Sequence, residues 1–147
     1  MRVFYCSMLV CVCAVAVAHG DDSAGATDDG KRIQGTWKPL AAELGGKPFP
    51  DDVLKTMKLI LADGKYTVMV GERPDEGTVK LDATKSPRAM DIVGTKGPNL
   101  GKTIPAIYEL TGTTLKICYD LSGKSRPKEF KTLPDSQLFL VEYKRQP

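Results

Sequence analysis

Cys118 is the residue of this sequence best suited to nucleophilic chemistry, because a thiolate is a strong nucleophile. The chain has four cysteines but a single histidine, His19. Thiolate catalysis needs a neighbouring base, and His19 stands at the start of a polar segment far from Cys118 in the sequence. We therefore expect no catalytic residue, and too few histidines and cysteines remain to predict a metal site or a cofactor.

The position of Cys118 in its own strand pattern is unusual for a free thiol. Side chains alternate across a strand, so Cys118 shares the outer face with Lys116 and Asp120. The other three cysteines belong to an N-terminal leader, which leaves no partner for an internal disulfide. Either a loop covers Cys118 or the thiol pairs with a second chain, and the sequence leaves both explanations open.

Residues 97–103 resemble a phosphate-binding loop at first sight. Gly97 and Gly101 are followed by Lys102, but three residues separate the two glycines where the phosphate motif has four. A strand pattern containing Pro105 follows, so no helix N-terminus is available for a phosphate. We interpret the segment as a turn.

Two pairs of acidic residues could in principle perform acid–base chemistry. Asp51-Asp52 fall at the predicted start of a helix, and Asp75-Glu76 fall in a predicted loop, residues 72–76. Nothing in the sequence brings the pairs into one pocket. We expect all four carboxylates to be solvated at the surface.

Short runs of alternating apolar and polar residues dominate the chain after residue 32. In the first run the phase flips at Pro39, which predicts a bulge after which Leu40, Ala42 and Leu44 continue the apolar face. Asp63-Gly64 is the strongest hairpin signal. The eight predicted strands cover residues 33–44, 57–61, 65–70, 78–82, 89–93, 103–110, 114–119 and 138–145.

Links of hairpin length between most of these runs indicate an antiparallel meander. Exposed sheet edges invite aggregation, so closure is the expected outcome. Pro50-Asp51-Asp52 predicts one helix of about two turns, and the connection 120–136 has room for a short strand around Phe130. The predicted fold class is all-β: an eight-stranded antiparallel up-and-down barrel with one short helix.

The first 18 residues have the features of a secretory signal peptide. Arg2 precedes an apolar stretch, and Ala16-Val17-Ala18 forms a small-residue cleavage site. The stretch is shorter than the roughly 20 residues of a membrane-spanning helix. We expect cleavage after Ala18, export to the periplasm or the exterior, an acidic disordered linker over residues 19–31, and one domain over residues 32–147.

Charge is balanced along the chain. There are 21 Lys and Arg against 18 Asp and Glu, a net charge of +3, without blocks of one sign. Nucleic acid and anionic membrane surfaces require concentrated basic patches. We therefore expect neither partner, no membrane span in the mature chain, and a monomer.

Several short motifs together carry a resemblance to a known family. They are Ile33-Gln34-Gly35-Thr36-Trp37-Lys38, Gly46-Lys47-Pro48, Lys65-Tyr66, Gly101-Lys102-Thr103, Ile107-Tyr108-Glu109-Leu110, Leu115-Lys116-Ile117-Cys118-Tyr119 and Arg126-Pro127-Lys128-Glu129-Phe130. With Gly-x-Trp on the first strand and a basic residue in the last, the chain resembles the lipocalin group. More closely, it resembles a lipocalin-like domain of unknown function from exported planctomycete-type bacterial proteins.

The resemblance implies how the barrel is closed. In lipocalins the first-strand tryptophan is packed by a basic residue of the last strand, so Trp37 is expected to stack with Arg145, while Gly35 lets the backbone pack closely. Lys144 is the alternative partner, but it is out of phase with the apolar residues of its run. These three residues, Gly35, Trp37 and Arg145, are expected to have a structural role.

The remaining candidate site is the barrel interior. An eight-stranded barrel is either filled by side chains or holds one small ligand, and tyrosines on an apolar wall supply polar groups for binding. The inward candidates are Tyr66, Val68, Val79, Leu81, Met90, Ile92, Ala106, Tyr108, Ile117 and Tyr119. From these, the predicted ligand-binding residues are Tyr66, Val68, Met90, Tyr108, Ile117 and Tyr119.

The expected function is that of a non-catalytic, exported binding module for a small apolar or amphipathic molecule. The alternative is a solid-core barrel that acts as a protein- or envelope-interaction module. An enzyme is a third reading, carried only by the resemblance, because some barrels of this group catalyse rearrangements with pocket tyrosines and arginines.

Overall fold

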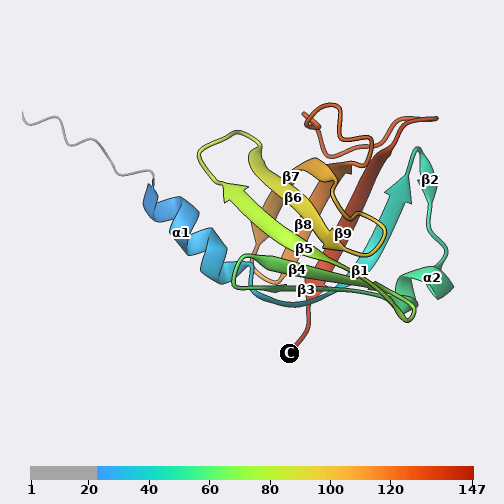
Figure 1. Ribbon diagram of the computed structural model, residues 1–147, viewed down its shortest axis with the longest axis horizontal. Helices are drawn as coiled ribbons and strands as arrows, with labels where there is room; N and C mark the ends of the chain where they lie inside the picture. Colours follow the sequence, from blue (N-terminus) through green and yellow to red (C-terminus); the bar gives the residue numbers. More distant parts are fainter. Residues whose placement is uncertain (1–22) are drawn as a thin grey trace, which may run out of the picture.

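The computed structural model describes residues 23–147 of the chain (Figure 1). The predicted signal peptide, its cleavage site after Ala18, and His19 lie outside the described residues. Within the described part, no helix is both long enough and apolar enough to cross a membrane.

Eight antiparallel strands form a closed barrel, which confirms the predicted fold class. Neighbours in sequence are neighbours in the sheet from β3 to β9, and β1 closes the barrel by pairing with both β3 and β9. A two-residue strand, β2, pairs with Glu43 and Leu44 at the end of β1. The strands are β1 (Gly35–Leu44), β2 (Lys47–Pro48), β3 (Met57–Ala62), β4 (Lys65–Val70), β5 (Arg73–Asp82), β6 (Arg88–Lys96), β7 (Thr103–Thr111), β8 (Thr114–Asp120) and β9 (Leu138–Arg145).

The predicted bulge in β1 is present. The pairing of β1 with β9 shifts register between Pro39 and Ala41. Leu40 and Ala41 are consecutive exposed residues, whereas Ala42 is buried. The prediction that Leu40 continues the apolar face is therefore wrong, because the bulge consumes one extra residue before the inward phase resumes.

The predicted loop over residues 72–76 is also wrong, because β5 already begins at Arg73. Pro74 and Asp75 pair with β4 alone, since pairing with β6 begins only at Glu76. A proline fits there because one side of the strand needs no ladder hydrogen bond. The connection between β4 and β5 is reduced to Gly71-Glu72.

Two helices flank the barrel, α1 (Ser23–Arg32) and α2 (Asp51–Thr56). Helix α2 is the short helix expected from Pro50-Asp51-Asp52. A disordered linker is expected over residues 19–31. In the described part of this segment, which starts at residue 23, the chain instead forms α1. The physical reason lies in the barrel: the carboxylate of Asp29, 2% exposed, accepts hydrogen bonds from Arg88 Nη1 and the Tyr108 hydroxyl, both at 2.7 Å.

The hydrophobic core lies inside the barrel, and all ten residues predicted to point inward belong to it or pack against it. A second row of buried side chains lies on the outer face of β6, β7 and β8, where Ala89, Ile107 and Cys118 are aligned by strand pairing. The segment 121–137 passes over this row, with Cys118 Sγ 3.6 Å from the Lys131 carbonyl oxygen.

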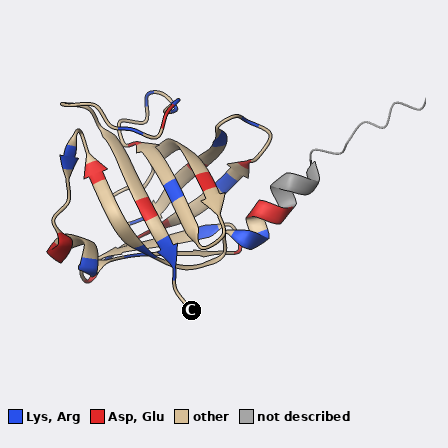
Figure 2. Cartoon of the chain, turned by 180° about the vertical axis from the view of Figure 1, so that it is seen from behind, with Lys and Arg blue, Asp and Glu red and all other residues tan. Residues whose placement is uncertain are grey.

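A covering loop is therefore present over the buried Cys118 thiol. Arg126 fastens the same segment by donating to the carbonyls of Met90 and Ala106, at 3.1 and 2.8 Å, and to Asp91 at 2.6 Å. No strand forms around Phe130 in the described chain. Lys, Arg, Asp and Glu are interspersed over the barrel without a face of one sign (Figure 2).

Candidate functional site

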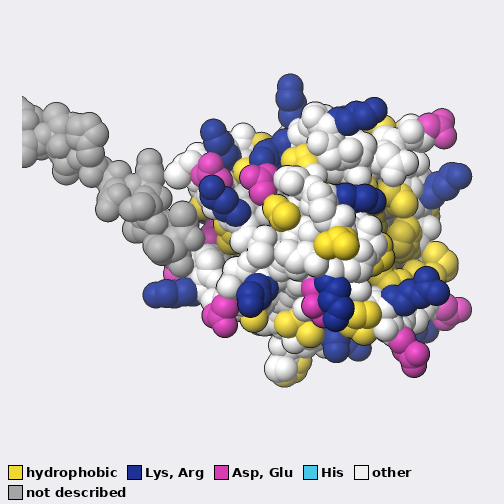
Figure 3. Space-filling view, in the orientation of Figure 1, with side chains coloured by type: hydrophobic (Ala, Val, Ile, Leu, Met, Phe, Trp, Pro, Cys, Tyr) yellow, Lys and Arg dark blue, Asp and Glu magenta, His cyan; other side chains and the backbone are white. Residues whose placement is uncertain are grey.

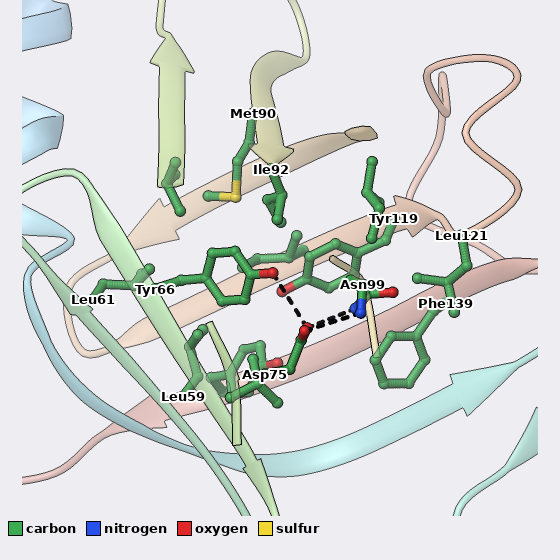
Figure 4. Close-up of a pocket in the computed structure, with 15 residues that line it drawn as sticks. Leu59, Leu61, Tyr66, Asp75, Met90, Ile92, Asn99, Tyr119, Leu121 and Phe139 are labelled. Atoms are coloured by element: carbon green, nitrogen blue, oxygen red, sulfur yellow. Dashed lines mark hydrogen bonds between the residues drawn. The ribbon is translucent and has the colours of Figure 1, made fainter. Parts of the chain in front are cut away.

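The barrel encloses a cavity of about 90 Å³ between the strands. Its walls are mostly hydrophobic, and its polar groups come from three tyrosines, one aspartate and one asparagine (Figure 4). The lining residues are Leu59, Leu61, Tyr66, Val68, Asp75, Val79, Met90, Ile92, Asn99, Ile104, Ile117, Tyr119, Leu121, Phe139 and Tyr143. The interior is thus neither completely filled nor widely hollow.

The structure brings five of the six predicted ligand-binding residues to this cavity. They are Tyr66, Val68, Met90, Ile117 and Tyr119. Tyr108 points inward as expected but does not line the cavity. It lies nearer the other end of the barrel, where its hydroxyl is bonded to Asp29 of α1. Alternation along β7 predicts which face of the sheet Tyr108 occupies. Its position along the barrel axis depends on the stagger between strands, which alternation does not reveal.

Asp75 is the polar centre of the cavity. Its carboxylate accepts hydrogen bonds from the Tyr66 hydroxyl at 3.2 Å, from the Asn99 backbone N–H at 3.2 Å and from Asn99 Nδ2 at 2.6 Å. Figure 4 shows these groups converging from β4, β5 and the loop after β6. The interpretation of Asp75 as a solvated loop residue is therefore wrong.

A signal for Asp75 was available in the sequence. Asp75, Gly77 and Val79 are spaced by two, so an inward Val79 places all three on the inner face. The proline before Asp75 obscured this phase because it indicated a loop. For Asn99 the sequence holds no comparable signal, since it belongs to a loop whose course depends on tertiary contacts.

Two glycines make this arrangement possible. A Cβ on Gly77 would lie 2.6 Å from Tyr66 Cε1 and 2.0 Å from the Val93 carbonyl oxygen. The Tyr66 ring can therefore pack directly over Gly77, and in this position its hydroxyl reaches the Asp75 carboxylate. A Cβ on Gly94 would lie 1.9 Å from the Asn99 carbonyl oxygen. The loop after β6 can therefore fold back on Gly94 and present Asn99 to the cavity.

The cavity tyrosines remain protonated at neutral pH. Burial raises the pKa of Tyr143 to about 12 and that of Tyr119 well above its ordinary value, and the two hydroxyls interact. Burial, followed by the nearby charge of Asp75, raises the pKa of Tyr66. General bases work best with a pKa near the operating pH. These hydroxyls are therefore suited to hydrogen bonding with a bound molecule and not to proton abstraction.

The opposite end of the barrel is closed as predicted. Arg145 Cζ lies 4.3 Å from the ring centre of Trp37, which is completely buried, and the two residues are register partners. Trp37 Nε1 donates to the Ile33 carbonyl at 2.9 Å. A Cβ on Gly35, whose φ is +138°, would lie 2.7 Å from Arg145 Nη1. Lys144 pairs instead with Lys38.

The described residues contain no group of three or more His, Cys, Asp or Glu side chains that could hold a metal ion. Comparisons of the chain with protein-family models, with curated proteins and with solved structures gave no match. The functional argument therefore rests on the residues of this chain.

Proposed function

We propose that the chain is an exported, non-catalytic binding module that takes a small apolar or amphipathic molecule into its barrel. The observation that carries the proposal is an apolar cavity with hydrogen-bonding groups gathered around Asp75. Apolar walls with a few convergent polar groups are typical of small-molecule sites.

The size of the cavity limits the occupant. A volume of about 90 Å³ is smaller than the roughly 150 Å³ of an engineered apolar cavity that binds benzene. The proposed ligand therefore has only a few non-hydrogen atoms, unless the loop that carries Asn99 moves aside. This loop and Asp75 stand at the polar end of the cavity, where a larger molecule would have to displace them.

Three observations argue against catalysis. Cys118 lies on the outer face beneath residues 121–137, away from the cavity, and burial raises the pKa of its thiol. The cavity tyrosines are protonated. The described residues lining the cavity include no serine, threonine, cysteine, histidine or lysine.

Native mass spectrometry of protein purified from its own envelope tests the proposal, together with melting temperatures across a panel of small alcohols, hydrocarbons and amines. We expect a co-purifying small molecule or a raised melting temperature. Tyr119→Trp, which fills the cavity, should abolish uptake. Tyr108→Phe is the matched control because Tyr108 is buried but does not line the cavity. Persistent absence of any bound molecule and of any shift in melting temperature would overturn the proposal.

The interaction module is the second candidate, favoured by the modest cavity volume and by exposed apolar side chains on two loops. Leu100 is 65% exposed and Leu133 is 50% exposed. Hydrophobic side chains also occur in scattered groups on the face seen in Figure 3. For this candidate, Tyr119→Trp should change only stability, and Leu100→Ser should weaken capture of a partner.

A further inference from the structure

We infer that the cavity selects molecules with a protonated amine, held by the Asp75 carboxylate with the apolar part of the ligand against the hydrophobic wall. This inference rests on the proposed function and specifies the class of ligand. It predicts that neutral molecules of equal size bind more weakly and that carboxylates are rejected.

The charge of the cavity is the first argument. Asp75 is the one carboxylate among the described lining residues, and neither Lys nor Arg lines the cavity. No ion pair within the described chain involves Asp75. Of the two carboxylates that are almost completely buried in the described chain, Asp29 is paired with Arg88, whereas Asp120 accepts hydrogen bonds from neutral serine groups and does not line the cavity. Asp75 is thus a cavity carboxylate with neutral partners only.

The hydrogen bonding of Asp75 leaves one acceptor position of the carboxylate unused. Asn99 N–H binds Oδ1, whereas Asn99 Nδ2 and the Tyr66 hydroxyl bind Oδ2. A carboxylate has about four acceptor positions, so Oδ1 retains one. An ammonium group in this position makes a charge-assisted hydrogen bond, roughly twice as strong as a neutral one.

The walls favour the same occupant. Tyr119 and Phe139 stack with ring centroids 5.7 Å apart, and Tyr66 lies across the cavity (Figure 4). Aromatic faces attract cations. In such an apolar environment a carboxylate repels another anion strongly, because Coulomb interactions are weakly screened there. A fatty acid is therefore a poor ligand for this cavity, and a short alkylamine is a suitable one.

A purely structural role of Asp75 is the competing explanation, since Asp75 also holds the loop of Asn99 in place. The two roles differ in what they do to selectivity. A loop anchor affects the binding of all ligands equally, whereas a counter-ion affects only cationic ones.

NMR titrations with n-propylamine, 1-propanol and propionate separate the two roles, because these probes are similar in size and differ in charge. We expect n-propylamine to bind at least tenfold more tightly than 1-propanol, and propionate not to bind. Asp75→Asn should remove this preference while the affinity for 1-propanol changes less than threefold. The matched control is Glu76→Gln, which removes the next carboxylate along β5, one that lies 4.0 Å from Lys96 Nζ, and it should keep the preference.

Equal affinities for the amine and the alcohol in the unmodified protein would overturn the inference and leave the proposed function standing. An equal loss of both ligands in Asp75→Asn would assign Asp75 to loop anchoring and would also overturn the inference. If none of the three probes binds and Tyr119→Trp changes nothing, the proposed function fails together with it.

Discussion

Replacing Trp37 by alanine removes the largest side chain that the barrel buries completely. Large-to-small changes of this kind cost about 3 to 5 kcal/mol, because apolar contacts are lost and a cavity remains. This cost includes the stack with Arg145 at 4.3 Å, an interaction worth about 0.5 to 2 kcal/mol depending on desolvation. We expect the free energy of unfolding to fall by about 3 to 5 kcal/mol in total, a large part of the stability of a small domain.

Equilibrium unfolding in urea, followed by tyrosine fluorescence and far-ultraviolet circular dichroism, measures this loss. Lys38→Ala is the control, because Lys38 follows Trp37 on the same strand and is exposed; a surface change of this kind stays within about 0.5 kcal/mol. If Trp37→Ala does not fold, Trp37→Phe keeps a ring but loses the 2.9 Å hydrogen bond to the Ile33 carbonyl, at a cost of about 1 to 3 kcal/mol.

A loss below about 1 kcal/mol for Trp37→Ala would refute the packed position of Trp37, since removing a fully buried indole from a close-packed core costs more free energy than this. The pairing with Arg145 has its own check in a double-mutant cycle with Arg145→Met. A coupling energy near zero would mean that the guanidinium and the indole are neighbours without an energetic connection.

Three further predictions concern pH, the helix α1 and the barrel wall. Stability should begin to fall near pH 9, because burial raises the pKa of the Cys118 thiol above its ordinary value of 9.0, and should fall further from pH 10 towards 12, because the four described tyrosines, with folded-state pKa values raised above 10.0 and near 12 for Tyr143, also ionise first in the unfolded chain; tyrosinate absorbance of the folded protein at pH 10.5 would contradict this. Asp29→Asn should cost about 1 to 3 kcal/mol and release α1, seen as faster hydrogen exchange at Ile33, whereas unchanged exchange would show that the carboxylate does not hold the helix. Gly77→Ala should destabilise by at least about 1 kcal/mol, because its Cβ would lie 2.0 Å from a backbone oxygen, whereas Gly30→Ala, with no atom within 4 Å, should leave stability equal or higher; equal thermal midpoints for the two variants would refute this.

The strands were predictable from the sequence because one face of each strand is buried. Alternation then marks the inward residues directly, as for Met90 and Ile92 on β6 or Ile117 and Tyr119 on β8. The bulge at Pro39 was visible for the same reason, since an extra residue shifts the phase. The pairing of Trp37 with Arg145 needed the family resemblance in addition, because alternation alone does not say which strands close the barrel.

Other features depend on contacts between residues far apart in the chain. Asp29 is bonded to partners 59 and 79 residues away in the chain. Its neighbours in sequence are polar, so the local sequence alone predicts a linker. The sequence predicts a loop at Asp75 because a proline usually interrupts a strand. Here Pro74 is tolerated, because its missing backbone N–H lies on the side of β5 that has no neighbouring strand at this point. Asn99 reaches the cavity only because Gly94 lets the chain fold back.

The seam between β1 and β9 has a consequence for biosynthesis. β9 follows all the other barrel strands in the chain, so a chain truncated before residue 138 carries β1 and β8 with one unpaired edge each. Such edges pair readily with other polypeptides. The barrel therefore cannot close until β9 is available, and a premature stop codon that removes this strand should yield an aggregating product instead of a slightly shortened, functional one.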